Sequence, residues 1–431
     1  MQKRIDLFPI TARVEKDRLK IADHDLTTLA ETYGTPLYLY DRATLDHAVS
    51  EYKSALASHY PQPASVTYAG KAFLCLAIAQ WTQLQSLTVD CTGEGEIAIA
   101  VEAGVPRANI LVHGVNKSVA DLAAAVRHAN TIVVDNLYEL DRIRSHFSGQ
   151  AQLPDLWLRL LPGVSVTTHH THTQTGHHES KFGMTCEEFM EAVDICREHN
   201  LPLKGIHFHQ GSNFRDPEPL IPAIEMALDL AQKIGFTGEW HFCPGGGWGV
   251  AYHEDELPSP SIESYVRGIA EAVIEGCETR GLTLPHLHLE PGRSLVARAG
   301  VAIYQVGAVK KRGEKTWLLT DGGMADNPRF ALYGARYACL PVSGLGGERS
   351  DYVSIAGPYC ESGDIVIENL LMPSVETGAL IAIPVAGAYH LSMSSNYNGA
   401  RRPAVLWLEQ GRVQVIQRRE THQDLLDRDM R

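Results

Sequence analysis

The stretch Val66–Phe73 has the sequence Val-Thr-Tyr-Ala-Gly-Lys-Ala-Phe. Its first residues are β-branched, aromatic or small, which is typical of a buried strand, and Lys71 follows the run almost at once. A lysine at a strand end projects its amine into whatever cavity the sheet opens onto. A partly desolvated amine loses its proton more easily and can form a Schiff base with an aldehyde. A lysine that merely extends to solvent from a strand edge fits the segment equally well.

Short apolar runs of this kind recur eight times, with helix-period segments between them. The runs are Val66–Ala69, Leu87–Asp90, Ile110–His113, Ile132–Asp135, Leu156–Leu160, Gly205–His209, Trp240–Pro244 and Leu287–Glu290. Segments such as Asp121–His128, Cys186–Glu198, Leu220–Ile234 and Ile262–Arg280 have the spacing of helices. Alternation of strand and helix predicts parallel strands with right-handed crossovers, and eight such units predict a (β/α)8 barrel of the alanine-racemase-like kind. An open doubly wound sheet is the alternative, although no Gly-x-Gly-x-x-Gly opens a first strand–helix turn.

The pattern changes after Arg293, where strand-like runs follow one another with Gly and Pro between them and little helix. These runs are Val301–Lys310, Lys315–Thr320, Asp351–Ala356, Ala379–Val385 and Pro403–Glu409. Ala12–Ile21 and Pro36–Tyr40 are also strand-like, and Asp41 is suited to cap a helix over Ala43–Ala57. We therefore expect an α/β barrel over residues 42–298 and a β-rich domain made of residues 1–41 and 299–431.

The composition excludes several classes of partner. The 431 residues include 38 basic and 51 acidic side chains, a net charge of −13, which opposes binding to nucleic acid. The first residues contain no apolar signal region, and no stretch has the length of a membrane span. The eight cysteines are scattered without a Cys-x-x-Cys pair, which favours reduced thiols in a cytoplasmic protein over a disulfide framework or a zinc site.

Active sites of (β/α)8 barrels lie at the C-terminal ends of the strands, so the residues after each predicted strand are candidates. The first strand is followed by Lys71, and the sixth ends at His209 with Ser212 just beyond. The seventh precedes Gly245-Gly246-Gly247, and the eighth ends at Glu290 before Gly292 and Arg293. Consecutive glycines leave backbone N–H groups open to an anion, and barrels commonly hold a phosphate after the seventh strand. A flexible turn is the alternative for the glycines.

Glu290 is costly to bury unless it meets a positive partner, which can be a protonated pyridine nitrogen or Arg293. His209 can stack on a flat ring or act as an acid or base, although a lone histidine is more often structural. A lysine for a Schiff base, a glycine cradle for phosphate and a carboxylate for a ring nitrogen together predict pyridoxal 5'-phosphate.

With these residues in place, the chain resembles the fold-type III pyridoxal-phosphate-dependent decarboxylases, most closely the diaminopimelate decarboxylases, over nearly its whole length. The matching motifs are Tyr68-Ala-Gly-Lys71-Ala, Ser180-Lys-Phe-Gly183, His207-Phe-His209-Gln-Gly-Ser212, Gly245-Gly-Gly247, Glu290-Pro-Gly-Arg293, Arg329-Phe-Ala-Leu-Tyr333, Cys360-Glu-Ser-Gly-Asp364, Gly387-Ala-Tyr389 and Ser394-Ser-Asn-Tyr-Asn398. The resemblance implies a homodimer whose active site is shared between subunits.

The resemblance also implies roles for individual residues. The catalytic set is Lys71, Cys360, His209 and Glu290; the cofactor-binding set is Lys71, His209, Ser212, Gly245, Gly246, Gly247, Glu290, Gly292, Arg293 and Tyr389; the substrate-binding set is Arg293, Arg329, Tyr333, Glu361 and Tyr389. Lys71 carries the cofactor, His209 stacks on its ring, and Glu290 pairs with the ring nitrogen. Cys360 protonates the product from across the dimer interface.

Two arginines in the implied substrate set favour diaminopimelate, because they offer donors for a distal carboxylate while Glu361 accepts a distal ammonium. The expected reaction is conversion of meso-2,6-diaminopimelate to L-lysine and CO2, the last step of lysine biosynthesis. A decarboxylase of another basic amino acid (D-ornithine, D-lysine, L-ornithine, L-lysine or carboxynorspermidine) is the nearest alternative. A racemase of this fold would place arginine at the ring nitrogen, and a non-catalytic pyridoxal carrier would lack the β-rich domain.

Three positions depart from the family pattern: Gly70 stands where leucine is usual, Gly93 where serine is usual, and Phe330 where proline is usual. They leave room for an altered substrate. The segment His169–His178 is dense in histidine, which by itself suggests metal binding. We interpret it as a polar active-site loop with incidental metal affinity, and we expect no dedicated metal site.

Overall fold

The computed structural model describes residues 2–150, 152–163, 176, 179–347 and 349–430. Contacts between Cα atoms divide the chain into two compact units. The barrel unit comprises residues 49–249 and 260–292, and the β-rich unit comprises residues 1–48, 250–259 and 293–431. The two units are taken in turn below. The predicted domain boundaries, at 41/42 and 298/299, stay a prediction.

Eight parallel strands close into a barrel in the order β10-β11-β12-β5-β6-β7-β8-β9. They are β5 (Ala64–Ala69), β6 (Thr88–Cys91), β7 (Ile110–Val112), β8 (Thr131–Val134), β9 (Asp155–Arg159), β10 (Leu203–His207), β11 (His241–Cys243) and β12 (His286–Leu289). Every predicted barrel strand overlaps one of these strands. The barrel closes where Leu287 of β12 pairs with Ala64 of β5. The predicted (β/α)8 barrel is therefore confirmed, and the open sheet is wrong.

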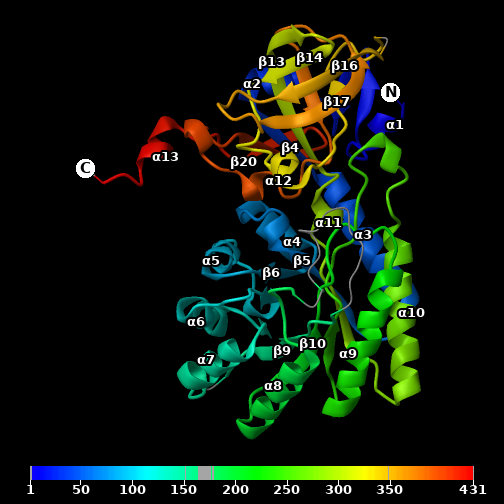
Figure 1. Cartoon of the computed structure of the whole chain (residues 1–431), viewed down its shortest axis with the longest axis vertical. Helices are drawn as coiled ribbons and strands as arrows, with labels where there is room; N and C mark the ends of the chain where they lie inside the picture. The colour runs from blue at the N-terminus through cyan, green and yellow to red at the C-terminus, as the bar shows by residue number, and fades with distance from the viewer. Residues whose placement is uncertain (1, 151, 164–175, 177–178, 348, 431) are drawn as a thin grey trace. The chain divides into compact units, whose positions relative to one another are not determined.

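Helices alternate with the barrel strands and lie outside them (Figure 1). They are α4 (Leu76–Leu84), α5 (Glu94–Glu102), α6 (Val119–His128), α7 (Leu137–Phe147), α8 (Cys186–Glu198), α9 (Ile221–Ile234) and α10 (Ile262–Arg280), and α3 (Arg42–His59) precedes β5. Asp41 caps α3 as predicted, since its Oδ2 accepts the backbone N–H of Thr44 at 3.1 Å. Leu287 and Leu289 of β12 are fully buried, whereas the alternate residues His286 and His288 belong to a histidine cluster. This period-two alternation decides which side chains share a face of each strand.

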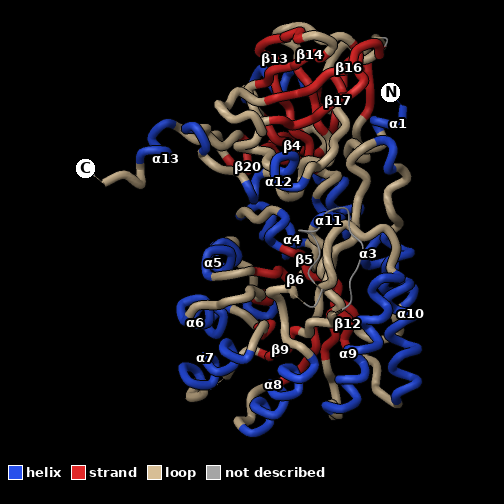
Figure 2. Tube along the Cα trace, viewed as in Figure 1, coloured by secondary structure: helices blue, strands red, loops and turns tan. Residues whose placement is uncertain are grey.

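Strands dominate the β-rich unit (Figure 2). Its main sheet runs β17-β16-β14-β13-β4-β19-β20, and β18 pairs with β13 and β15. The bounds are β4 (Leu37–Asp41), β13 (Gly300–Arg312), β14 (Lys315–Thr320), β15 (Leu340–Pro341), β16 (Arg349–Ala356), β17 (Ile365–Pro373), β18 (Leu380–Ile383), β19 (Ala404–Glu409) and β20 (Arg412–Gln417). The N-terminal strand β4 lies between β13 and β19, so the expected joining of N-terminal and C-terminal strands is confirmed.

The prediction of one strand over Ala12–Ile21 is wrong. The segment is a hairpin of β1 (Arg13–Glu15) and β2 (Arg18–Ile21), which forms a separate three-stranded sheet with β3 (His24–Asp25). The chain reverses at Lys16 and Asp17, whose φ angles are 50° and 61°. Two consecutive residues with positive φ form the tight turn of a hairpin, and no glycine marked it in the sequence.

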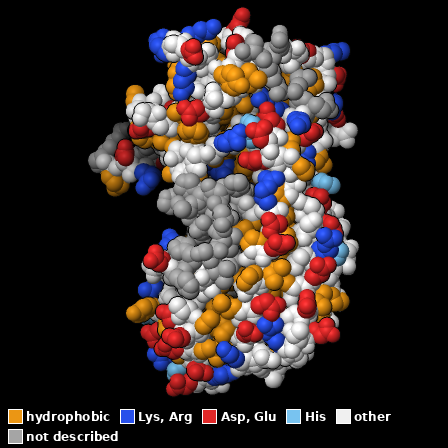
Figure 3. Space-filling view, turned by 45° about the vertical axis from the view of Figure 1, so that its right-hand side comes forward, with side chains coloured by type: hydrophobic (Ala, Val, Ile, Leu, Met, Phe, Trp, Pro, Cys, Tyr) orange, Lys and Arg blue, Asp and Glu red, His pale blue; other side chains and the backbone are white. Residues whose placement is uncertain are grey.

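Short helices complete the β-rich unit: α1 (Gln2–Ile5), α2 (Leu26–Tyr33), α11 (Arg293–Val296), α12 (Arg329–Tyr333) and α13 (His422–Leu426). Its core gathers aliphatic side chains of β2, α2, β4, β13 and β19, including Ile21, Leu26, Leu39, Ile303 and Leu406. On the face of the molecule in Figure 3, acidic and basic side chains are interspersed. Within the part of the chain that the structure describes, no helix is long and apolar enough to cross a membrane.

Candidate active site

Lys71 lies directly after β5, in the short 3-10 helix Gly70–Ala72. The backbone N–H of Ala69 donates to the carbonyl of Pro291 at 3.1 Å, so the Lys71 segment lies beside the Glu290–Gly292 segment. Asp90 and Glu96 interact electrostatically with the Lys71 ammonium. The Lys71 side chain is exposed in the chain by itself, so of the two interpretations of the segment this chain alone favours the lysine that extends to solvent.

The absence of a side chain at Gly70 lets the backbone before Lys71 lie close against β6. A Cβ on Gly70 would lie 2.6 Å from the carbonyl oxygen of Asp90, closer than real Cβ contacts allow. Backbone cannot yield as a flexible side chain can, so the leucine that is usual at this position does not fit here without a shift. The departure at Gly70 therefore follows from the close approach of the Lys71 segment to β6.

Glu290 follows β12 at the C-terminal end of the barrel, and two imidazoles hold its carboxylate. Nε2 of His113 donates to Oε1 at 2.8 Å, and Nε2 of His207 donates to Oε2 at 3.0 Å. Burial by itself would raise the pKa of Glu290, but the two imidazoles, each bonded to one carboxylate oxygen, outweigh it and hold the pKa well below the usual range. Burial also lowers the pKa of His207 to about 3, so His207 is a neutral N–H donor at pH 7.

His209 and the glycine turn approach each other closely. The backbone N–H of Gly246 donates to Nδ1 of His209 at 3.3 Å, which leaves the proton of the neutral ring on Nε2. Burial, followed by the charge of Lys71, lowers the pKa of His209 well below its usual value. Gly245 and Gly247 have φ angles of 77° and 103°, and a Cβ on Gly246 would overlap the carbonyl of Glu290. The turn therefore requires glycine.

The barrel residues fit pyridoxal phosphate on four grounds. An accessible amine follows β5, a buried carboxylate kept ionised follows β12, and a glycine turn that excludes side chains follows β11. The carboxylate can also take the ring nitrogen, because each oxygen of Glu290 accepts one imidazole N–H and keeps capacity for another donor, such as a pyridinium. The fourth ground is Gln210, which is buried between His209 and Ser212. Its amide atoms have no hydrogen-bond partner among the described residues and are available to a ligand.

Glu290 and four further buried barrel residues, His113, His207, Asp90 and Arg159, form a polar layer, and these four were not predicted as site residues. His113 and His207 bind Glu290, Asp90 lies 3.9 Å from Nε2 of His113, and Arg159 pairs with Asp135 at 3.4 Å. Burial raises the pKa of Asp90, and the charge of Glu290 adds to the rise. The signal for His207 was present in the sequence, because it ends the strand β10 and stands two residues before His209, the spacing of residues that share a face in extended chain.

The other predicted residues belong to the β-rich unit, where two arginines share a tyrosine. The guanidinium of Arg293 donates to the hydroxyl of Tyr252 and lies 4.8 Å from the ring centre of Tyr389. The guanidinium of Arg329 lies 4.5 Å from the ring centre of Tyr252. Both arginines are buried. Among the described residues, Nε of Arg329 has no hydrogen-bond partner and no carboxylate forms an ion pair with it.

A series of side-chain hydrogen bonds runs from the Arg329 guanidinium to Asp326. Its Nη1 donates to the hydroxyl of Tyr337, which lies 2.8 Å from Nε2 of His390. Nδ1 of His390 lies 3.2 Å from the hydroxyl of Tyr38, which donates to Asp326 at 2.9 Å. Burial raises the pKa of Asp326 to about 6. These contacts fix the Arg329 guanidinium in one orientation.

Cys360 and Glu361 are exposed in the β-rich unit, and Tyr333, at the end of α12, is half-buried. The backbone N–H of Cys360 donates to Oδ1 of Asn398 at 3.1 Å. Oε1 of Glu361 accepts from Ser362 and from the backbone of Gly363, both at 3.2 Å. The turn thus fixes the Cys360 backbone and leaves the two side chains accessible.

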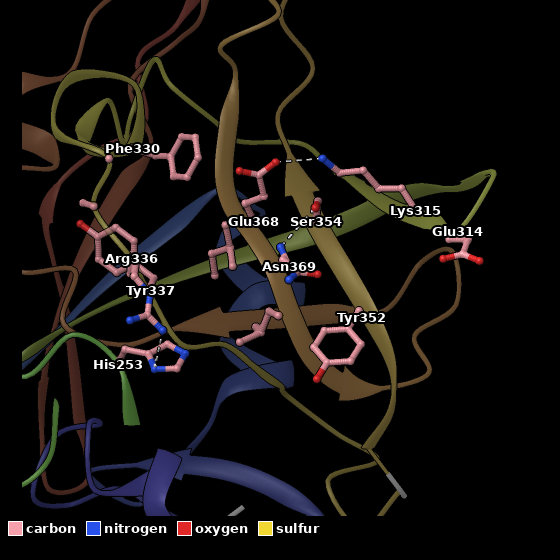
Figure 4. A pocket seen from close by; sticks show the side chains of 14 residues that line it. His253, Glu314, Lys315, Phe330, Arg336, Tyr337, Tyr352, Ser354, Glu368 and Asn369 are labelled. Atoms are coloured by element: carbon pink, nitrogen blue, oxygen red, sulfur yellow. Dashed lines mark hydrogen bonds and ion pairs between the residues drawn. The ribbon is translucent and has the colours of Figure 1, made fainter. Parts of the chain in front are cut away.

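A cavity of about 900 Å³ opens elsewhere in the β-rich unit (Figure 4). Phe330, Arg336 and Tyr337 line one side of it, and the ion pair between Lys315 and Glu368 lines the other. None of the predicted site residues lines this cavity. Of the histidine-rich segment His169–His178, only Gly176 is described, so its interpretation as an active-site loop lies outside the described residues.

Comparison with known proteins defines the class to which this fold and site belong. Residues 42–297, more than half of the chain, match the family model for the pyridoxal binding domain of pyridoxal-dependent decarboxylases. The diaminopimelate decarboxylase of Bacillus subtilis (strain 168) is 37% identical over 422 residues, covering 96% of this chain and 95% of that protein. That of Synechocystis sp. is 36% identical over 439 residues, covering 98% and 93%.

A crystal structure of diaminopimelate decarboxylase from M. jannaschii in complex with L-lysine superposes with a TM-score of 0.91 at 29% identity, covering 98% of each chain. The chain therefore belongs to the pyridoxal-dependent decarboxylases, and within them to the diaminopimelate decarboxylase family. The predicted family and the predicted class of enzyme are confirmed.

Proposed function

We propose that this protein binds pyridoxal 5'-phosphate and converts meso-2,6-diaminopimelate to L-lysine and CO2, the last step of lysine biosynthesis. The observation that carries the proposal is that the segment with Lys71 after β5 lies beside the segment with Glu290 after β12. The chain that holds them is similar over nearly its whole length to diaminopimelate decarboxylases. The similar M. jannaschii enzyme was crystallised in complex with L-lysine, which is the product of the proposed reaction.

The proposed cofactor-binding residues divide by the part of the cofactor that they would hold. Lys71 would hold the aldehyde carbon, His209 would lie against the ring, and Glu290 would face the ring nitrogen. The phosphate end would be held by Ser212, Gly245, Gly246, Gly247, Gly292 and Tyr389. Arg293 completes the cofactor-binding set and also belongs to the substrate-binding set. The cofactor supplies an electron sink for the pair of electrons left by departing CO2.

The proposed chemical roles concern Glu290, which lies in the polar layer, and Cys360. Glu290 stays anionic because His113 and His207 donate to both of its oxygens, so it favours a protonated ring nitrogen over a neutral one. The acidic partner at this position also argues against a racemase. Sγ of Cys360 would deliver a proton to the carbon that has lost CO2.

The proposed substrate contacts come from Arg293, Arg329, Tyr333, Glu361 and Tyr389. Arg329 supports a substrate with a distal carboxylate, because its buried guanidinium packs among tyrosines and keeps Nε without a partner in the described chain. A carboxylate would satisfy that charge with a charge-assisted hydrogen bond. Glu361 is exposed and would accept the distal ammonium.

We further propose a homodimer in which Cys360 and Glu361 of one subunit complete the site around Lys71 of the other. This arrangement is supported by the exposure of both side chains. Cys360 and Glu361 are neighbours in a turn whose backbone is held by Asn398, and each has a proposed chemical role. A cytoplasmic location is supported by the eight cysteines, all of which are free thiols.

The substrate assignment is tested with a panel of amino acids. The protein loaded with pyridoxal phosphate is incubated separately with meso-diaminopimelate, L-lysine, L-ornithine, their D-forms and carboxynorspermidine, while CO2 and the amine product are measured. We expect turnover of meso-diaminopimelate at least a hundredfold above the others. Preference for any other member of the panel would overturn the substrate but leave the cofactor proposal standing.

A further inference from the structure

Three histidines gather at the end of the barrel opposite to the candidate active site. His241 is the first residue of β11, His286 is the first residue of β12, and His288 follows two residues later on β12. Glu290 lies just beyond the other end of β12, roughly 13 Å from His286 and roughly 7 Å from His288 at a rise of about 3.3 Å per residue. His288 is thus the inner member of the cluster, and none of the three histidines is among the residues bonded to Glu290. The cluster of His241, His286 and His288, called the histidine cluster below, is therefore separate from the cofactor site.

Strand pairing explains why the three imidazoles meet. His241 pairs directly with His286 across the parallel ladder of β11 and β12. His286 and His288 share one face of β12, and their ring centres lie 4.3 Å apart with 21° between the planes. One ligand nitrogen from each of the three rings can be chosen so that all three lie within 4.8 Å of one another.

The nitrogen atoms are close to the spacing of metal ligands. Nδ1 of His241 lies 2.9 Å from Nε2 of His288. Two ligands on tetrahedral zinc lie roughly 3.3 Å apart, given Zn–N bonds of about 2.0–2.1 Å. A small rotation of the two rings would widen the distance between these nitrogens to that of zinc ligands. A metal ion would then take the place of the proton that the two nitrogens share.

Neighbouring side chains supply the outer shell that metal sites need. Oγ of Ser65 lies 2.7 Å from Nε2 of His286 and can fix the tautomer of that ring. A carboxylate oxygen of Glu239 lies 4.0 Å from Nδ1 of His286, and the Glu239 side chain is 74% exposed, so it can swing in as a fourth ligand. The buried ring of Trp157 stacks on His241 with centres 5.3 Å apart and shields the inner side of the cluster.

Ligand type and access favour a transition-metal ion. Each of the three imidazoles in its neutral form offers a ring-nitrogen lone pair to a cation. His241 and His286 are half-buried, which leaves a path from solvent. Imidazole nitrogen favours first-row transition ions such as zinc over magnesium or calcium, which prefer oxygen ligands.

We propose that His241, His286 and His288 form a binding site for one divalent transition-metal ion, with Zn²⁺ as its representative, at the N-terminal end of the barrel. The ion joins β11 and β12 at their first residues. It takes no part in the chemistry at Lys71.

The test must separate this site from the histidine-rich segment, which can bind metal by itself. In a background variant, His169, His170, His172, His177 and His178 are replaced by glutamine. The full chain, loaded with pyridoxal phosphate and stripped with a chelator, is titrated with Zn²⁺ against a chromophoric competitor. We expect one Zn²⁺ per chain, and a tetrahedral d–d spectrum when Co²⁺ replaces Zn²⁺.

In the same background, His286→Gln and His241→Gln are expected to weaken Zn²⁺ binding at least tenfold and to abolish the Co²⁺ spectrum. The matched control His146→Gln removes an exposed histidine of α7 and should leave binding unchanged. Circular dichroism of each metal-free variant shows whether the barrel is intact. Absence of stoichiometric binding in the background variant, or equal binding by folded His286→Gln and His241→Gln variants, would overturn the proposal.

Discussion

Glu290 accepts a hydrogen bond from Nε2 of His207 at 3.0 Å, in a layer where both residues are buried. The contact keeps a carboxylate charged at a place where burial alone would neutralise it. A carboxylate that stays anionic can keep a ring nitrogen protonated, and a neutral carboxyl group cannot. The proposed decarboxylation therefore depends on imidazoles that do not themselves contact the reacting bond.

Replacing His207 by leucine is expected to raise the pKa of Glu290, because Oε2 loses its donor while the site stays buried. An unsatisfied buried group costs about 1–3 kcal/mol. We expect kcat to fall about tenfold at pH 7 and the acidic limb of the pH–rate profile to move upward. His207→Gln, which keeps an N–H donor, should recover most of the activity. An unchanged pH–rate profile in His207→Leu would contradict this role.

The stability of the fold is expected to fall in acid partly through His207. Its folded pKa of about 3 lies below the unfolded value near 6.5, so unfolding takes up a proton between about pH 3 and pH 6.5. Stability from this group is therefore complete above pH 6.5 and decreases by about 1.4 kcal/mol per pH unit between the two pKa values. Glu290, whose folded pKa is also lowered, adds to the loss only below about pH 4.5.

Denaturant unfolding between pH 6.5 and 4.5 isolates the histidine contribution. The free energy of unfolding of the His207→Gln variant should fall less steeply with decreasing pH than that of the wild type. Equal slopes in the two proteins would show that His207 is not held neutral.

Gly70 is expected to resist substitution by leucine, the residue usual in the family. Its Cβ would meet the Asp90 carbonyl at 2.6 Å, and overpacking against backbone costs about 1–3 kcal/mol. We expect Gly70→Leu to lower the thermal midpoint and to displace Lys71, with at least a tenfold loss of kcat/KM. Gly95→Ala is the matched control, because a Cβ there meets nothing within 4 Å. Wild-type activity in Gly70→Leu would refute the steric account.

Tyr337 is expected to position Arg329 for substrate. Tyr337→Phe removes the acceptor of the Arg329 guanidinium and the partner of His390 together. Because the arginine would hold a part of the substrate remote from the reacting bond, KM for meso-diaminopimelate should rise about tenfold with a smaller change in kcat. The exposed Tyr352, changed to phenylalanine, serves as control. A selective loss of kcat with constant KM would point to a different role.

A buried ion pair in the barrel wall gives a prediction about stability. Nζ of Lys117 lies 2.6 Å from Oε1 of Glu139, and both side chains are at most 1% exposed. Glu139→Ala leaves the ammonium buried without its carboxylate, which is expected to cost about 3–5 kcal/mol in the free energy of unfolding. The double variant Lys117→Met/Glu139→Leu should recover most of that loss. A change below 1 kcal/mol in Glu139→Ala, measured by urea unfolding, would be inconsistent with the pair.

The barrel was predictable because each of its strands is a compact apolar run set off from a helix-period segment. The hairpin at Lys16-Asp17 was missed because no glycine marked its turn, and β17 was missed because Glu368 and Asn369 interrupt its apolar run. Asn369 has a φ of 57°, and the pairing of β16 with β17 shifts register along its length. Such irregularity is decided by the neighbouring strand, which local sequence does not reveal.

The site could be predicted where a motif names the residue and not where partners come from distant strands. Lys71 and the glycine turn follow predicted strands, and His209 and Glu290 are the last residues of two others. His113 binds Glu290 although 177 residues separate them, and only the closed barrel brings the two together. The exposure of Lys71 was likewise not predictable, because it depends on the packing around the strand end.

The most direct test of the proposed function is the conversion of meso-diaminopimelate by the protein loaded with pyridoxal phosphate. We predict that CO2 and L-lysine appear in equal amounts, and that Lys71→Ala abolishes both while the protein stays folded. Loading is verified by a visible absorbance band that borohydride removes. Absence of CO2 and lysine from a fully loaded, folded protein would contradict the account.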